Sequence, residues 1–288
     1  MGVLLLKSLV YGIIEGVTEW LPVSSTGHLI LLEDILTLQV GTQVHPLFAS
    51  EFWELFLVTV QLGAIFAVLT TYHTRLLAPL FKHETRWSAV GLWSRVIVGC
   101  IPAGIAGVAV DAILTRICGK DMDGLFYNGV TVAAMLMLYG VLFIMAERVR
   151  RGKTEEACDL AELPFGKCLG VGLFQVLSLV PGTSRSGATV LGGMLAGLAR
   201  PVAAEFSFFL GIPTMCGASA LKCTKFFFEG NGLTGEELAM LVAGSVTAFL
   251  CSLMAIRVLL DFVRRHTFTA FGVYRILLGI AVLGTLIL

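Results

Sequence analysis

Long apolar stretches, separated by short polar segments, cover most of this chain. A membrane-spanning helix needs about 20 predominantly apolar residues. Stretches of that length occur at 53–70, 94–114, 126–146, 204–221, 238–260 and 270–288. The hydropathy pattern therefore predicts a set of transmembrane helices.

Two further apolar regions, 3–37 and 166–198, are each broken near the middle by a run of Pro, Gly, Ser and Thr. The apolar piece on either side of each break is roughly 12–16 residues long, which is too short to cross a bilayer alone. Each region is therefore predicted to form a re-entrant pair of short helices that enters and leaves the membrane at one face.

The two halves of the chain resemble each other weakly. Aligning Pro22 with Pro181 pairs Val-Ser-Ser with Gly-Thr-Ser, and Glu51-Phe falls near Glu205-Phe at a similar offset. Chance similarity between apolar helices is the alternative explanation. If the repeat is real, each half crosses the membrane an odd number of times, so the second half is inverted relative to the first, as in many transporters.

We therefore predict an all-α, polytopic integral membrane protein built as one membrane domain from two inverted repeats. Each repeat contains one re-entrant helix pair and three transmembrane helices. The first repeat spans residues 1–150, with the re-entrant pair 3–37 and the spans 53–70, 94–114 and 126–146. The second spans 164–288, with the re-entrant pair 166–198 and the spans 204–221, 238–260 and 270–288.

Composition and charge agree with this class. The chain is 57% hydrophobic and 14% charged, whereas soluble domains are about a quarter charged. Its 20 basic and 20 acidic residues balance, so nothing points to a nucleic-acid partner. In the predicted topology one face carries eleven loop Lys and Arg residues and the other carries five. Basic loops stay in the cytoplasm, so both termini are expected outside.

The first polar run, from Glu15 to His28, carries two carboxylates, several hydroxyls and an imidazole. Glu15 and Glu19 are four residues apart and so share one helix face. Of two like charges this close in a low-dielectric site, one stays protonated unless a divalent cation that suits hard oxygen ligands, Mg²⁺ or Ca²⁺, binds between them. The alternative is a helix end at the membrane surface, which needs no cation.

Hydroxyl residues follow the break at Pro22. Ser25 and His28, three residues apart, lie on adjacent helical turns and suit either a nucleophile with its base or two groups flanking an attacking water. Ser24 and Thr26 are candidate phosphate ligands, although they are equally suited to capping the helix. The alternative for His28 is a hydrogen-bonded interior histidine.

The second polar run, Pro181-Gly-Thr-Ser-Arg-Ser-Gly187, contains an arginine. A guanidinium at membrane depth needs a partner, and its planar fork fits phosphate oxygens. A structural ion pair of Arg185 with Glu15, Glu19 or Glu205 is the alternative. Arg275, in an apolar span, is expected to reach toward a lipid headgroup. The candidate ligands of a phosphate in this run and just after it are Gly182, Thr183, Ser184, Ser186, Gly187 and Thr189.

These two runs together resemble the undecaprenyl-diphosphate phosphatase family of the bacitracin-resistance type, and the likeness extends over almost the whole chain. The resemblance implies an enzyme of the bacterial plasma membrane that removes the terminal phosphate of a polyprenyl diphosphate lipid. It also implies a divalent-cation requirement and an active site that opens toward the outer face. The implied roles are metal binding for Glu15 and Glu19, acid–base work for Glu19, chemistry for Ser25 and His28, and diphosphate binding for Arg185.

Two other functions stay open at this stage. A transporter or flippase for a phosphorylated polyprenyl lipid would share the inverted repeats and the anion site. An intramembrane serine hydrolase using Ser25 and His28 is weaker, because the chain has no G-x-S-x-G nucleophile elbow. The sequence does not decide whether Ser25 or water attacks phosphorus, and a homodimer is an open alternative to the monomer.

Overall fold

The computed structural model describes residues 2–35, 39–40, 43–44, 51–77, 86–120, 122–155 and 158–286. The end of the predicted pair 3–37 and residues 287–288 lie outside these ranges. The α-helices are α1 Gly2–Thr18, α2 Ser25–Ile35, α3 Glu51–Thr71, α4 His73–Leu76, α5 Arg86–Cys118, α6 Met122–Phe126, α7 Gly129–Arg150, α8 Phe165–Val176, α9 Arg185–Leu195, α10 Arg200–Phe228, α11 Gly235–Arg265 and α12 Thr269–Thr285. Two 3₁₀ turns, η2 Leu160–Glu162 and η3 Leu177–Leu179, and one antiparallel pair, β1 Gln39–Val40 with β2 Gln43–Val44, complete the described elements.

The all-α membrane fold is confirmed. Within the described ranges, five helices are long and apolar enough to cross a membrane: Phe52–Thr71, Ser88–Cys118, Gly129–Arg150, Arg200–Phe228 and Gly235–Arg265. They coincide with five of the six predicted spans and extend several of them. The sixth, predicted at 270–288, is the shorter apolar helix α12.

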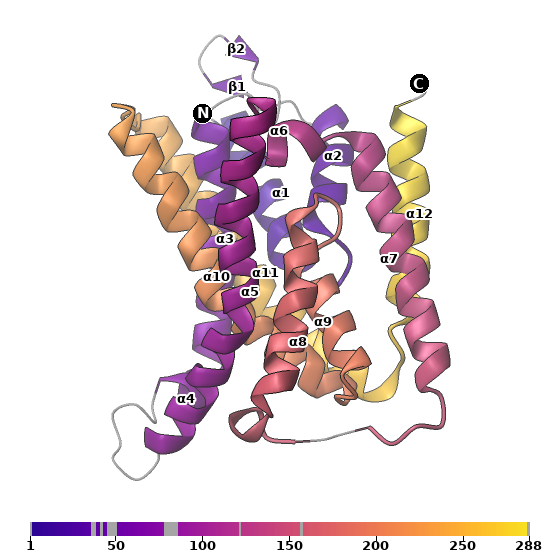
Figure 1. The fold of residues 1–288 in the computed structure, drawn as a ribbon. Coiled ribbons are helices and arrows are strands. Elements are labelled where there is room, and N and C mark those ends of the chain that lie inside the picture. The colour runs from indigo at the N-terminus through magenta and orange to yellow at the C-terminus, as the bar shows by residue number, and fades with distance from the viewer. Residues whose placement is uncertain are drawn as a thin grey trace.

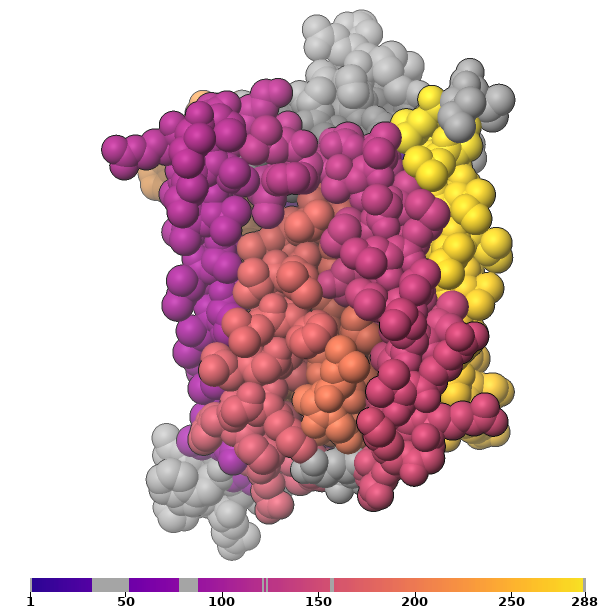
Figure 2. Space-filling view, turned by 45° about the vertical axis from the view of Figure 1, so that its right-hand side comes forward, coloured from indigo at the N-terminus to yellow at the C-terminus, as the bar shows by residue number. Residues whose placement is uncertain are grey.

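Both regions broken by proline fold as helical hairpins. The chain ends α1 at Thr18 and begins α2 at Ser25, and it ends η3 at Leu179 and begins α9 at Arg185. In Figure 1 both chain termini lie at the same end of the molecule; the α1–α2 hairpin begins there, whereas the α8–α9 hairpin begins at the opposite end. Figure 2 shows the α8–α9 hairpin at the surface, bordered on one side by α7.

Helix pairing relates the two halves. α1 packs along α11 and α8 packs along α5, while α7 packs against α12 and α3 against α10. In the predicted repeats α1 corresponds to α8 and α5 to α11, so exchanging the two halves converts the α1–α11 pair into the α8–α5 pair. The same exchange leaves the α7–α12 and α3–α10 pairs unchanged. That exchange is the packing an inverted repeat would produce, and the repeat boundaries at 150 and 164 stay a prediction.

The α1–α11 contact is close enough to bring the two backbones together. A Cβ atom added at Gly12 would lie 2.5 Å from the carbonyl oxygen of Gly244, and one added at Gly16 would lie 2.5 Å from that of Ala248. Small residues allow membrane helices to approach in this way, and the gain comes from van der Waals contact rather than hydrophobic burial. This contact fixes α1, and with it the acidic pair at the end of α1.

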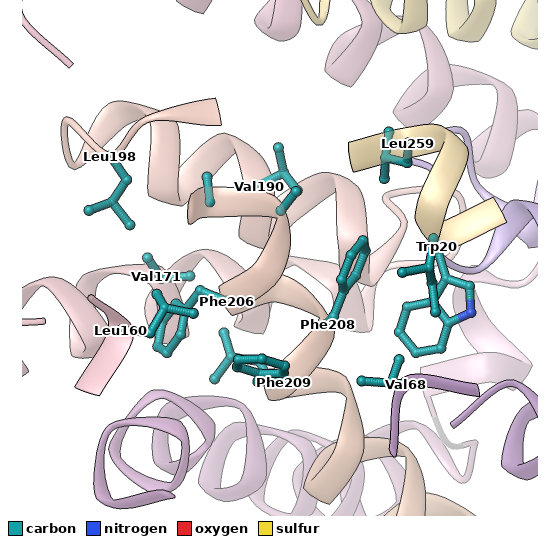
Figure 3. Packing of buried hydrophobic residues seen from close by; sticks show 14 of the residues in the cluster. Trp20, Val68, Leu160, Val171, Val190, Leu198, Phe206, Phe208, Phe209 and Leu259 are labelled. Carbon is teal, nitrogen blue, oxygen red and sulfur yellow. The ribbon is translucent and has the colours of Figure 1, made fainter. Parts of the chain in front are cut away.

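A cluster of aromatic side chains supports the first loop from the α10 side. Phe206, Phe208 and Phe209 are fully buried, as is Trp20, which follows Glu19. Trp20 meets Phe208 edge-on with ring centroids 5.4 Å apart. Figure 3 shows both side chains within the buried cluster. The chain near Glu19 is therefore held by packing on α10 in addition to the α1–α11 contact.

The base of the second hairpin is fixed by ionic contacts. Arg150, at the end of α7, donates to the carbonyl oxygens of Met194 at 2.5 Å and Leu198 at 2.6 Å, which lie at and just beyond the end of α9. Arg200 pairs with Glu147 at 2.6 Å. These contacts join α7 to the chain on either side of the α9–α10 turn.

Candidate active site

The two loops share one unusual backbone feature. Ser24 and Ser184 have φ values of 71° and 68°, and among the described residues they are the only positions other than glycine with positive φ. Each immediately precedes the second helix of its hairpin. Such strain costs on the order of 1–3 kcal/mol per residue and is concentrated at functional sites. The strained backbone at the same position in both loops therefore marks each loop as a candidate functional site.

This feature corrects the register of the sequence alignment. Aligning Pro22 with Pro181 paired Ser25 with Ser184, but backbone conformation and helix start make Ser24 the counterpart of Ser184. The second loop has one more residue between its proline and its cap. The counterpart of Ser25 is therefore Arg185, so the two loops place a hydroxyl and a guanidinium at matching positions.

Glu19 and Arg185 meet across the two hairpins. The Nη2 and Nε atoms of Arg185 lie 3.2 Å and 3.4 Å from one carboxylate oxygen of Glu19, and Nη1 donates to the carbonyl oxygen of Ser207 at 2.7 Å. The guanidinium also lies 5.5 Å from the Trp20 ring centroid. Glu15, Glu19 and Glu205 were the candidate ion-pair partners of Arg185, and Glu19 is the one that it contacts. Glu205 instead binds Arg75 at 2.9 Å.

Glu15 is the most unusual carboxylate of the site. It is 2% exposed, and neither of its carboxylate oxygens has a hydrogen-bond partner among the described residues. The Gln61 side chain lies near this carboxyl group but does not form a hydrogen bond with it. The Glu19 carboxylate also lies near Glu15, and the Ser25 hydroxyl lies near Glu19. The structure therefore places Glu15, Glu19, Ser25 and Arg185 in one cluster.

His28 faces a different set of groups. Its Nδ1 lies 2.7 Å from the carbonyl oxygen of Ser24, and its Nε2 lies 2.7 Å from the hydroxyl of Tyr274 on α12. Both ring nitrogens are thus engaged away from the Glu19–Arg185 pair. The proposed pairing of the Ser25 hydroxyl with His28 is not the arrangement seen here, because both ring nitrogens of His28 contact other groups.

Sequence reasoning missed the role of Arg275. It is 0% exposed, so the expectation that it reaches a lipid headgroup is wrong. Its Nη1 donates to the carbonyl oxygen of Pro22 at 3.2 Å, and its Nη2 donates to those of Gly182 and Thr183 at 2.9 Å each. One guanidinium thus joins both loops. The only sequence signal was an arginine inside an apolar stretch, a signal that Arg185 shares.

Several candidate phosphate ligands are occupied by contacts within the protein. The Ser184 hydroxyl accepts the Gly187 N–H at 3.2 Å and so caps α9, which removes that amide from an anion site. Ser186 donates to the carbonyl oxygen of Leu21 at 3.2 Å. Thr189 donates to the Ser207 hydroxyl at 2.7 Å. The Ser186 contact ties the two loops together, and the Thr189 contact holds α9 on α10.

Other candidates keep free polar atoms. Ser24 does not cap α2: its hydroxyl is buried without a partner among the described residues, as is that of Thr183. Thr26 is half-buried on the first turn of α2. Gly182 has φ 90°, and a Cβ there would lie 2.7 Å from the Val132 backbone, so packing alone requires this glycine. Ser24 and Thr183 are therefore the hydroxyls most available to a ligand.

Comparison with known proteins gives a consistent picture. A family model described as bacitracin resistance protein BacA matches residues 8–281. A protein of Enterococcus faecalis named undecaprenyl-diphosphatase is 44% identical over 280 residues, covering 96% of this chain and 96% of its own length. Proteins with the same name from Streptococcus thermophilus and Streptococcus suis are each 46% identical, covering 97% and 96% of this chain and 92% and 94% of their own lengths.

Proposed function

Because the chain belongs to the bacitracin resistance protein BacA family, we propose that it is a membrane phosphatase that hydrolyses undecaprenyl diphosphate. The products are undecaprenyl phosphate and inorganic phosphate, so the reaction recycles the lipid carrier for cell-wall synthesis and confers bacitracin resistance. The relatives that share most of their length with this chain carry the name of this activity.

The observation that carries the proposal is the contact between Glu19 and Arg185, which come from different hairpins. Phosphoryl transfer depends mainly on positioning and on stabilising negative charge that develops on the transferring group. Arg185 provides a fixed positive charge beside a carboxylate able to take a proton. The diphosphate head enters the loop contact, where Arg185 exchanges its contact with Glu19 for phosphate oxygens, while the polyprenyl tail stays along the apolar helices.

The chemistry requires an oxygen to attack the terminal phosphorus while the bridging P–O bond breaks and undecaprenyl phosphate leaves. The attacking atom is either a water oxygen or Oγ of Ser25, and Glu19 lies next to Ser25 and accepts the proton. If Ser25 attacks, a water must then cleave the phosphoserine to release phosphate. His28 contacts the Ser24 carbonyl oxygen and the Tyr274 hydroxyl, so it does not activate Ser25 directly. Its imidazole instead provides a second group that can take up or release a proton.

Replacing Ser25 separates the two routes. We expect Ser25→Ala to abolish turnover if a phosphoserine forms, because alanine has no nucleophile. Retention of more than about a tenth of the wild-type kcat would eliminate the covalent route and assign the attack to water. Trapping of ³²P on the wild-type protein after an acid quench, with Ser25→Ala as the control, gives an independent readout.

The carboxylate pair fits a divalent cation. Glu15 has two buried oxygens without hydrogen-bond partners, and Glu19 has one oxygen not used by Arg185. Mg²⁺ is commonly held by one or two carboxylates together with water and substrate phosphates. Glu15 and Glu19 would hold Mg²⁺ or Ca²⁺, which would supply charge stabilisation at the phosphate oxygens. Among the described residues no group of three or more His, Cys, Asp or Glu side chains converges, so phosphate or water must complete the coordination.

For the orientation, both termini lie outside and the site opens toward the outer face. The support is the excess of basic loop residues at the end opposite the termini, since such residues favour the cytoplasm. Cys118 is exposed and is the last residue of α5, a helix that ends on the side of the termini. In a variant that keeps only this cysteine, an impermeant maleimide added to intact cells should label it.

The deciding experiment is phosphate release by the purified protein in detergent, with undecaprenyl diphosphate as substrate. A phosphatase releases inorganic phosphate without a sealed compartment, whereas a flippase releases none and needs vesicles to show its activity. Release at a rate proportional to protein concentration, lost in Glu19→Gln, supports the proposal. Absence of release by the wild-type protein, together with movement of the lipid across vesicles, would establish the transporter alternative.

A further inference from the structure

Tyr274 on α12 makes a specific contact with His28 on α2, although 246 residues separate them. The phenolic oxygen lies 2.7 Å from His28 Nε2, and the two rings are nearly parallel, with an interplanar angle of 15° and centroids 5.6 Å apart. No feature of the sequence around Tyr274 indicated this role. The contact places a hydroxyl group on the one ring nitrogen that the backbone does not bind.

Hydrogen-bond chemistry assigns the direction of each contact. A carbonyl oxygen only accepts, so His28 Nδ1 must carry a hydrogen to bind the Ser24 carbonyl oxygen at 2.7 Å. The neutral imidazole then has an unprotonated Nε2, which accepts the Tyr274 O–H. When Nε2 gains a proton, the same phenolic oxygen accepts from it. Tyr274 therefore serves both charge states of His28 without moving.

The position of Tyr274 is itself fixed by its neighbour. Arg275, the next residue on α12, is 0% exposed and donates to carbonyl oxygens of both loops. Tyr274 is 45% exposed, so packing of its own ring does not hold it in place. The backbone anchored by Arg275 presents the phenol to His28, in the way that outer groups orient catalytic histidines elsewhere.

We propose that Tyr274 is a positioning residue of the phosphatase reaction, whose hydroxyl holds the His28 imidazole in one orientation in both of its charge states. The inference rests on the proposed function, since it concerns a residue that acts through His28. It assigns to α12 a part in the chemistry in addition to the joining of the two loops by Arg275. Tyr274 itself does not touch the substrate.

The test compares Tyr274→Phe with Tyr72→Phe in the full-length protein. Tyr72 is a matched control, because its hydroxyl is buried without a hydrogen-bond partner among the described residues and it packs on Phe209. Loss of one hydrogen bond that matters in the transition state should lower kcat about tenfold. We expect that loss in Tyr274→Phe with KM changed less than about twofold, and wild-type kinetics in Tyr72→Phe.

Two further readouts separate positioning from simple structural support. In a His28→Ala background, Tyr274→Phe should cause no additional loss of kcat, because the residue it positions is gone. In protein labelled with ¹⁵N-histidine, the Nε2 signal of His28, assigned by its absence in His28→Ala, should shift in Tyr274→Phe and stay in place in Tyr72→Phe.

The proposal is overturned by an unchanged ¹⁵N signal and kcat in Tyr274→Phe, or by the same fold-loss with and without His28. A raised KM at unchanged kcat would instead show that Tyr274 touches the substrate. If the proposed function itself is wrong, the wild-type protein releases no phosphate. The ¹⁵N comparison still reports on the contact between Tyr274 and His28 in that case, so the two failures can be told apart.

Discussion

Two arginines perform different tasks at the loop contact. Arg185 pairs with the Glu19 carboxylate, so its charge is balanced by an acidic partner. Among the described residues Arg275 binds only backbone carbonyl oxygens, and it lies 5.5 Å from the Tyr139 ring centroid. Burying a charge without an ionic partner is costly, so Arg275 is retained for the three carbonyl oxygens that it joins.

Replacing Arg275 with methionine should separate the loops while keeping the apolar bulk of the side chain. We expect kcat for phosphate release to fall at least about 100-fold, because misplacing catalytic groups by about 1 Å costs that much. Arg257→Met on the exposed face of α11 is the matched control and should keep wild-type activity. Wild-type kinetics in Arg275→Met, at an unchanged thermal midpoint, would show that Arg275 is not needed to hold the two loops together.

At this scale the sequence singled out Glu19 and Arg185, because each is a charge in a polar break of apolar sequence, but it offered Glu15, Glu19 and Glu205 alike as ion-pair partners of Arg185. It did not predict Arg275 or Tyr274, which lie in an apolar helix about 250 positions beyond the first loop in a chain of 288. Their partners are three backbone carbonyl groups and a histidine ring. Such contacts depend on how α12 packs, and residue type alone does not reveal them.

At the scale of helices, proline and hydroxyl residues were reliable guides. The breaks at Pro22 and Pro181 became the turns of both hairpins, and the strained serine of each turn could be located only from its backbone angles. Helix ends were less predictable: α5 runs from Arg86 to Cys118, well beyond the expected 94–114. Polar residues at the ends of a membrane helix continue its hydrogen bonds into the interface, where hydropathy gives no signal.

The packing of α1 on α11 is testable by a single methyl group. Gly16→Ala places a Cβ 2.5 Å from a backbone oxygen of Ala248, so the two helices must separate. Such overpacking costs about 1–3 kcal/mol and should lower the thermal midpoint in detergent. Because Glu15 and Glu19 flank this glycine, kcat should fall as well.

Gly217→Ala supplies the control for that change. Gly217 lies within α10, and a Cβ there has nothing within 4 Å. Alanine has a higher helix propensity than glycine by about 1 kcal/mol, so this variant should match or exceed wild-type stability. Equal midpoints for Gly16→Ala and Gly217→Ala would contradict the close α1–α11 contact.

At the scale of the whole molecule, the fold brings two distant hairpins to one place. Pro22 and Gly182 are 160 positions apart in sequence, yet Arg275 binds the carbonyl oxygens of both. The general class of the fold followed from hydropathy, since spans and breaks are properties of local sequence. How far the hairpins overlap, and that α12 closes over their contact, follow from packing between helices that hydropathy does not describe.

Removal of divalent cations tests the charge balance of the assembled site. With EDTA present, phosphate release should fall at least about 100-fold, because charge stabilisation at the phosphate oxygens is lost. Added Mg²⁺ or Ca²⁺ should restore it, and Glu15→Gln should require more cation for half-maximal activity. Full activity after exhaustive chelation would rule out a cation between Glu15 and Glu19.

We propose that the two hairpins form one active centre through the contact between Glu19 and Arg185. The most direct measurement is a double-mutant cycle on kcat/KM for phosphate release with Glu19→Gln, Arg185→Gln and the double variant. Each single change should cost at least about 100-fold, and the double variant should be no worse than the weaker single variant, because residues acting as one unit are not additive. Losses that multiply, as for independent sites, would contradict the claim.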